Sequence, residues 1–150
     1  LRHFSEKQSI KTVELAQMYS KDGVVGFDIA ADEAGFSLDN HISSFNYAIN
    51  NNINCTAHAG EAKGAGSIWE TIKKLKSKRI GHGVRCTEDK ELVKYLKEND
   101  YHLEICVSSN IKTKTFNKIE DHPISDIFNS SISLSINTDG RTISDTSLTN

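Results

Sequence analysis

The sequence predicts an α/β fold in which helices cover a parallel sheet. Five short runs are rich in apolar or β-branched residues, as strands are, and they begin roughly every 25–30 residues, the length of a βα unit. A loop and a segment of helical periodicity follow each of the first four runs. This regular alternation is typical of a parallel sheet with helices outside it. The expected strands are residues 24–30, 55–58, 79–83, 102–106 and 132–137.

Four helices are expected from apolar residues that recur near the helical period. The first ends before a turn signal at residues 21–23. The other three are expected to begin near Ser37, Ser67 and Thr87, and Ser67 forms a capping-box pattern with Glu70. The apolar positions are Ile10, Val13 and Met18; Leu38, Ile42, Phe45 and Ile49; Ile68, Ile72 and Leu75; and Leu92, Val93 and Leu96.

Length and composition indicate one globular domain, or one piece of a larger one. The 150 residues are 37% hydrophobic and 25% charged, which excludes a disordered chain, and a net charge of -2 disfavours a dedicated nucleic-acid binder. No apolar run is long enough for a membrane span, and residues 1–7 lack the apolar region of a secretory signal. The cysteines, Cys55, Cys86 and Cys106, are odd in number and form no C-x-x-C, so a reducing, cytoplasmic location is expected.

Polar residues stand at the end of each expected strand. In α/β folds the functional groups gather at the carboxyl ends of the strands and in the loops that follow them. Such residues therefore lie on one rim of the expected sheet. In chain order they are Asp28, Ala31-Asp32-Glu33, His58, Glu61, His82, Glu104, Ser108-Ser109-Asn110 and Asp139.

Four of these residues have simpler interpretations when each is taken alone. His58 suits a half-buried structural histidine, and Glu61 suits the positive end of the next helix. His82 lies between two glycines and suits a tight turn, while Asp139 begins an Asp-Gly turn. Together, however, two histidines, an aspartate and a glutamate on one rim supply what metal-assisted hydrolysis requires: ligands, a proton shuttle and a group that holds hydroxide.

Five segments also resemble the ordered motifs of the adenosine deaminase family, and the similarity covers nearly the whole chain. The combination of H-A-G-E, G-H-G and a later T-D is specific, whereas H-x-x-E alone is not. The segments are Gly26-Phe-Asp-Ile-Ala-Ala-Asp-Glu33, His58-Ala-Gly-Glu61, Arg79-Ile-Gly-His-Gly-Val84, Leu103-Glu-Ile-Cys-Val-Ser-Ser-Asn110 and Ser135-Ile-Asn-Thr-Asp139.

The resemblance implies a zinc-dependent (β/α)₈ barrel that hydrolyses adenosine, and deoxyadenosine, to inosine and ammonia in purine salvage. His58 and Asp139 would be zinc ligands, and zinc makes hydroxide available near neutral pH. Glu61 would donate a proton to purine N1, and His82 would hold the attacking hydroxide. The segment at Ala31 would offer a backbone N–H to purine N3. The resemblance also implies polar-network roles for Asp28 and Glu104.

The chain departs from the family pattern at three points. Ala31 stands where the family often has glycine, and Gly140 stands where many members have an aspartate that contacts purine N7. The His-x-His pair that completes the family's metal site is absent. His3, His41, His102 and His122 are isolated, and we interpret each as surface or structural.

A complete barrel takes about 250 residues and eight strands. The five expected strands therefore predict a partial TIM barrel covering about strands 4 to 8, with residues 1–150 as the C-terminal portion of a single barrel domain. Since only two of the expected four protein ligands lie in this chain, we expect weak zinc binding and little turnover from the isolated 150 residues. Robust inosine formation by those residues alone would contradict that expectation.

Several alternatives stay open at this point. The substrate could be adenine or another 6-aminopurine nucleoside, or the chain could be a catalytically incompetent binding module. A phosphate-binding α/β barrel fits less well, because residues 139–141, Asp-Gly-Arg, do not form the glycine-rich loop that binds an anion. Cytidine-type deaminases are excluded because they require P-C-x-x-C in addition to H-x-E, and the chain has no P-C-x-x-C. The expected partner is a small purine nucleoside, not a nucleic acid or a membrane, and the oligomeric state is left open.

Overall fold

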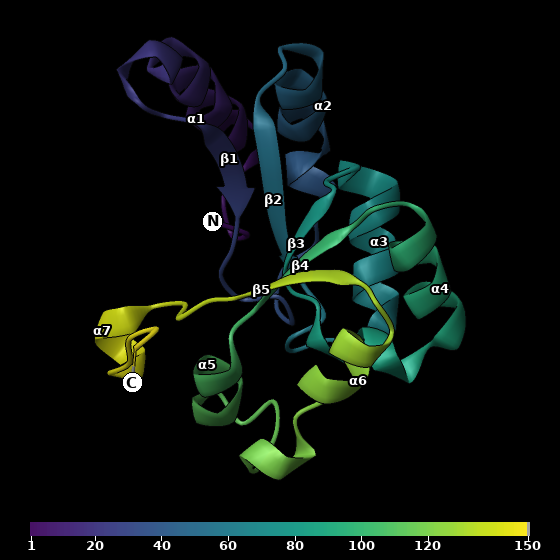
Figure 1. Ribbon diagram of the computed structural model, residues 1–150. Coiled ribbons are helices and arrows are strands. Elements are labelled where there is room, and N and C mark those ends of the chain that lie inside the picture. The colour runs from purple at the N-terminus through teal and green to yellow at the C-terminus, as the bar shows by residue number, and fades with distance from the viewer. Residues whose placement is uncertain (150) are drawn as a thin grey trace.

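The structure is a computed structural model, and it describes residues 1–149. Five parallel strands form one sheet in the order β1-β2-β3-β4-β5, so each strand pairs with its neighbours in the chain. Figure 1 shows the strands with α2, α3 and α4 along one side of them. The predicted α/β class is confirmed. The strands are β1 (Gly26–Ile29), β2 (Asn54–Ala59), β3 (Arg79–His82), β4 (His102–Ile105) and β5 (Ser133–Ile136).

The four predicted helices are present, and three short ones follow the last two strands. The long helices are α1 (Glu6–Met18), α2 (Ile42–Asn50), α3 (Ala65–Leu75) and α4 (Lys90–Glu98). The short helices are α5 (Val107–Lys112), α6 (Ile124–Asn129) and α7 (Arg141–Ser144). Single 3₁₀ turns lie at Ser20–Asp22, Asp39–His41, Val84–Glu88 and Ile119–Asp121. Of the described residues, no helix has both the length and the apolar character that a membrane span requires.

Two of the predicted helix starts are wrong because the serines make other contacts, Ser37 with a neighbouring residue and Ser67 with a distant one. The hydroxyl of Ser37 accepts a hydrogen bond from the backbone N–H of Asp39, so it supports the 3₁₀ turn that precedes α2. Ser67 lies inside α3, which begins after Gly64. Its hydroxyl donates to Glu33 Oε1 over 2.5 Å instead of capping the helix. The capping-box pattern at Ser67 therefore does not form a helix cap, because the distant Glu33 carboxylate binds the Ser67 hydroxyl.

The start of α4 is also two residues later than predicted. Thr87 belongs to the 3₁₀ turn Val84–Glu88, and Asp89 is the N-cap residue. The Asp89 carboxylate accepts hydrogen bonds from the N–H groups of Glu91 and Leu92. Asp89 also accepts a bond from the Trp69 indole, which ties this helix start to α3.

The core consists of two apolar clusters on the helix-covered side of the sheet. One joins α1 and α2 to β1 and β2, and the other joins α3 and α4 to β3 and β4. Val13, Phe45 and Leu96 are fully buried, as the helical periodicity predicts. Met18 and Ile49 are exposed, because each lies at the carboxyl end of its helix. The strands are thereby held in a fixed register, with His58 of β2 opposite Gly81 of β3.

Candidate metal and catalytic site

The five residues predicted to form the site line one cavity of about 340 Å³. The cavity lies at the carboxyl ends of the strands, where the loops after β1, β2, β3 and β5 converge. A larger hollow of about 790 Å³ lies toward the amino ends of β1–β3 and contains none of the five. The residues brought together are Ala31, His58, Glu61, His82 and Asp139.

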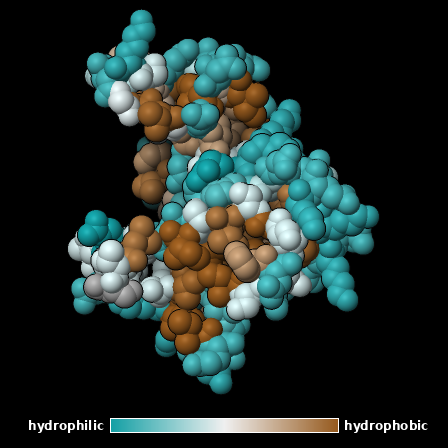
Figure 2. Space-filling view, in the orientation of Figure 1, coloured by the Kyte–Doolittle hydropathy of each residue, from teal (hydrophilic) through white to brown (hydrophobic). Residues whose placement is uncertain are grey.

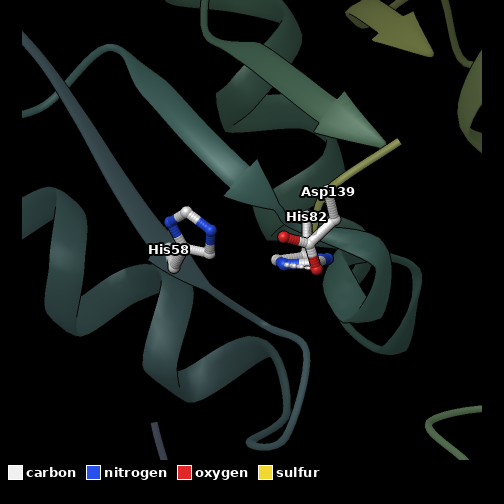
Figure 3. A group of neighbouring side chains, drawn as sticks. All are labelled: His58, His82 and Asp139. Carbon is white, nitrogen blue, oxygen red and sulfur yellow. Dashed lines mark ion pairs between the residues drawn. The ribbon is translucent and has the colours of Figure 1, made fainter. Parts of the chain in front are cut away.

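His58, His82 and Asp139 form a compact group of possible metal ligands. Their ligand atoms all lie within 4.8 Å of one another, and the three side chains point toward one another in Figure 3. His58 comes from β2, His82 ends β3, and Asp139 follows β5. Sheet topology therefore assembles a group whose members are 24 to 81 residues apart in the sequence.

Three site residues adopt the left-handed backbone conformation that side chains usually avoid. The φ angle is 81° at Ala31, 62° at His82 and 58° at Asp139. The left-handed region costs roughly 1–2 kcal/mol for most residues, and Ala31 lacks the polar side chain that compensates aspartate there. Such strain persists where the surrounding structure dictates the conformation, and it clusters at functional sites. The backbone N–H of Ala31 donates no hydrogen bond to any of residues 1–149.

Gly81 provides the space in which the His58 ring sits. A Cβ atom at position 81 would lie 2.8 Å from His58 Nδ1 and 2.9 Å from its Cγ, closer than real Cβ contacts. The φ angle of Gly81 is not positive, so contact and not backbone strain explains the glycine. Gly83, in contrast, has a φ of 67° and permits the sharp turn after His82.

We expect Gly81→Ala to weaken metal binding, because the added methyl group displaces the His58 ring. The expected loss is about 10–100-fold in zinc affinity, the usual effect of disturbing the groups that orient a ligand. It is measured by competition with a chromophoric chelator, in a chain of full family length that contains these residues (below, the full-length protein). Gly66→Ala is the control, because a Cβ there meets nothing within 4 Å. Equal zinc affinity in both variants would contradict the placement of His58.

Glu61 lies beside His82 and is held by two donors. Its Oε2 is 3.4 Å from His82 Nε2. Asn110 and Thr113 donate to its Oε1 over 3.2 and 3.1 Å. Asp139 is held similarly, since the Ser109 hydroxyl donates to its Oδ2 over 2.7 Å. The two carboxylates are thus oriented by side chains of α5 and the turn after it.

The two histidines differ in their electrostatic surroundings. Burial opposes protonation of His58, but nearby Asp28 and Asp139 outweigh it and raise the pKa of that imidazole. Burial lowers the pKa of His82, whose side chain is only 1% exposed, and it outweighs the opposing effect of the Glu61 carboxylate. His82 is therefore neutral near pH 7, while His58 attracts positive charge, whether a proton or a cation.

The donor set fits a divalent metal ion. Imidazole nitrogen and carboxylate oxygen are the ligands that zinc takes in hydrolytic sites. His58 Nδ1 is buried and makes no hydrogen bond with the described residues, although Asp28 Oδ1 lies 3.4 Å away. His58 and Asp139 could hold the ion, and His82 lies close enough to be a third ligand by distance alone.

Other predicted residues lie outside the group. Asp28 contacts His58, as the polar-network interpretation expects, but Glu104 pairs with Arg79 over 2.6 Å and does not line the cavity. The three cysteines are free thiols. Burial raises the pKa of Cys55 to about 11, and those of Cys86 and Cys106 to about 12. None of the three lines the cavity.

Glu33 is the main residue that sequence reasoning missed. Its carboxylate is 5% exposed and accepts hydrogen bonds from four consecutive backbone N–H groups, those of residues 60–63, and from the Ser67 hydroxyl. The distances run from 2.5 to 3.1 Å. Glu33 therefore fixes the loop that carries Glu61. A glutamate after Asp32 gives no local signal of this role, because its partners are 27 to 34 residues away.

A parallel sheet with two histidines, an aspartate and a glutamate at its carboxyl edge is typical of metal-dependent hydrolases with an α/β barrel. The particular family follows from the sequence comparison. The adenosine deaminase family model matches residues 1–150, and the chain belongs to that family.

Curated and solved relatives agree with this membership. The chain is 38% identical over 148 residues to the adenosine deaminase of Clostridium acetobutylicum, covering 99% of this chain and 44% of that protein. It is 39% identical over 138 residues to that of Erwinia tasmaniensis, covering 92% and 41%. The apo structure of an N6-methyl-AMP deaminase from Arabidopsis thaliana matches with a TM-score of 0.89 and 31% identity, over 99% of this chain and 43% of that one. The chain thus spans about two fifths of the length of these relatives.

Proposed function

We propose that this chain contributes to the zinc-dependent hydrolytic deamination of adenosine and deoxyadenosine to inosine and ammonia, a reaction of purine salvage. The observation that carries the proposal is the cavity at the carboxyl ends of the strands. It brings together His58, Asp139, Glu61 and His82, two expected metal ligands and the two side chains expected to act on the substrate and the nucleophile. Family membership supports the same chemistry.

We also propose that residues 1–150 form the C-terminal portion of one barrel domain, covering about strands 4 to 8. In the described sheet β1 and β5 each have a single neighbouring strand. Apolar side chains are exposed beside β5, with Phe128 71% and Ile136 47% exposed. Figure 2 shows brown, hydrophobic surface in the region where Figure 1 places β5 and α6. Further strands and helices of a barrel would cover these edges and side chains.

Each side chain has a distinct task in the proposed reaction. His58 and Asp139 would hold the zinc ion, which when bound supplies a nucleophilic hydroxide near neutral pH. Glu61 donates a proton to purine N1, which makes C6 electrophilic. His82 faces Glu61 and orients the oxygen nucleophile. The unpaired N–H of Ala31 lies on the same cavity and donates to purine N3.

Three classes of 6-aminopurine are candidate substrates for this site. The curated relatives are named adenosine deaminase, which favours the nucleoside. A second candidate is a 6-aminopurine nucleotide, because the Arabidopsis relative is named an N6-methyl-AMP deaminase. Adenine is a third, since a solved structure at 27% identity is named an adenine deaminase from Arthrobacter aurescens.

One experiment separates these candidates from a metal-free binding module. The purified full-length protein is analysed for zinc and incubated with adenosine, deoxyadenosine, N6-methyl-AMP and adenine. The deaminated purine is measured in each case, together with the amine released, which is methylamine from N6-methyl-AMP and ammonia from the other three. We expect near one zinc per chain and the highest kcat/KM with the two nucleosides. Absence of zinc together with absence of a deaminated purine from every substrate would refute the proposal in favour of a binding module.

We expect Gly140→Asp to add a contact to purine N7. A Cβ at position 140 would meet nothing closer than 3.9 Å, and the φ of -62° suits any residue. Gly140 is also the N-cap position of α7, where aspartate is favoured. The variant should therefore discriminate more strongly between adenosine and 7-deazaadenosine than the wild type, by about 10-fold in kcat/KM for one added hydrogen bond. Unchanged discrimination would show that this position does not face N7.

The proposed location is the cytoplasm. All three cysteines are free thiols, which accords with a reducing compartment. The proposed partner is a small purine nucleoside.

A further inference from the structure

Two residues with no part in the proposed catalytic set connect the first turn of α6 to the cavity. Asn110, in α5, is fully buried, and His122, which precedes α6, is 6% exposed. Each makes hydrogen bonds through every polar side-chain atom it has. Together they form a chain of bonds from the backbone of Ile124 to His82 and Glu61. This inference rests on the proposed function and concerns how its machinery is positioned.

The direction of the chain is set at the Ile124 end. The backbone N–H of Ile124, at the start of α6, is only a donor, and it points at His122 Nδ1 over 3.2 Å. Burial lowers the pKa of His122, so its ring is neutral near pH 7. A neutral imidazole has one N–H. Since Nδ1 accepts, the proton of His122 is on Nε2, which donates to Asn110 Oδ1 over 3.2 Å.

The orientation of the Asn110 amide follows from that bond. With its oxygen toward His122, the NH₂ group faces the cavity and lies 3.2 Å from both Glu61 Oε1 and His82 Nδ1. An amide nitrogen has two hydrogens, one for each acceptor. The opposite orientation would set the amide oxygen against the Glu61 carboxylate and leave the His122 N–H facing another donor.

We propose that His122 and Asn110 are positioning residues that fix the single proton of His82 on Nε2. Because His82 Nδ1 accepts from Asn110, the N–H of the neutral ring is on Nε2, which lies 3.4 Å from Glu61 Oε2. A protonated Nε2 has no lone pair for a metal ion, so His82 is a donor to the oxygen nucleophile although it lies among the ligand atoms. The same amide orients Glu61, so one residue aligns both groups.

The direct test needs no substitution in the relay. Histidine ring nitrogens of the full-length protein are labelled with ¹⁵N, and long-range ¹H–¹⁵N correlations are recorded without metal and after addition of zinc. The His82 signals are identified by their absence from a His82→Asn sample. We expect the proton on Nε2 and a bare Nδ1 in both states. A proton on Nδ1 would overturn the proposal.

Two variants of His122 separate positioning from packing. His122→Phe keeps an aromatic ring against Phe116, 5.1 Å away, but removes both nitrogens. We expect His82 to populate both tautomers. We also expect kcat to fall about 10–100-fold with KM little changed, which is the usual effect of removing a group that orients a functional side chain. His122→Gln keeps an N–H donor for Asn110 and should recover most of kcat.

The outcomes also distinguish this inference from the proposed function. If no 6-aminopurine is deaminated by the wild type, the proposed function fails, while the tautomer of His82 still tests the relay. If His122→Phe keeps the wild-type tautomer and kcat, the relay is refuted. It is also refuted if both His122 variants lose kcat equally while His82 keeps its Nε2 proton.

Discussion

Replacing Glu61 by glutamine in the full-length protein is expected to lower kcat for adenosine by about 10²–10⁴-fold, the usual contribution of a general acid. Glutamine preserves the shape of the side chain and keeps an oxygen for the Asn110 and Thr113 donors, so the cavity should stay intact. It has no acidic proton for purine N1. Zinc content should be unchanged, because His58 and Asp139 are untouched.

Steady-state kinetics and zinc analysis measure this result directly. Glu98→Gln is the matched control, because Glu98 is exposed on α4 and does not line the cavity. It should leave kcat and zinc content at the wild-type level. A Glu61→Gln variant that deaminates adenosine nearly as fast as the wild type would show that another group protonates N1.

Replacing Glu33 by glutamine is expected to reduce both stability and activity. The amide can accept with its oxygen alone, so its NH₂ group faces N–H groups of residues 60–63 that the carboxylate satisfied. Leaving buried donors unpaired costs about 1–3 kcal/mol each, so we expect the free energy of unfolding to fall by about 3 kcal/mol. Because this loop carries Glu61, kcat should fall as well.

Ser67→Ala provides a graded comparison. It removes one of the five donors to Glu33 and leaves the four backbone bonds, so its effect on unfolding should be about 1 kcal/mol. Denaturant unfolding of the full-length protein measures both values. An effect of Glu33→Gln no larger than that of Ser67→Ala would contradict the anchoring role.

The charge of Glu33 also makes stability depend on pH. Burial alone would raise the pKa of this carboxyl, but the Ser67 hydroxyl and the N–H groups of residues 60–63 together lower it. Because the folded-state pKa lies below the unfolded value, Glu33 contributes stability that is present above pH of about 4.3. That contribution is lost as the pH falls through the lower, folded-state pKa. The difference in unfolding free energy between wild type and Glu33→Gln should therefore shrink on acidification.

The strands and the residue types of the site were predictable from local patterns. Runs of apolar and β-branched residues at βα spacing located all five strands, and the rule that functional groups gather at their carboxyl ends placed Ala31, His58, Glu61, His82 and Asp139 on one rim. Helix starts were less predictable. Ser67 has the local signature of a cap, but a buried carboxylate 34 residues earlier offers its hydroxyl a better partner.

The sequence by itself determined the α/β class, the order of the motifs and the chemical groups at the strand ends, because these depend on spacing within one element or one βα unit. Only the tertiary structure decided which groups hold those residues in place. Glu33 anchors residues 60–63, and Asn110 joins His122 to His82 and Glu61 over as many as 49 residues. Such bonds form where packing buries polar atoms that must find partners, and the partners are chosen by proximity in the folded sheet, which no local pattern records.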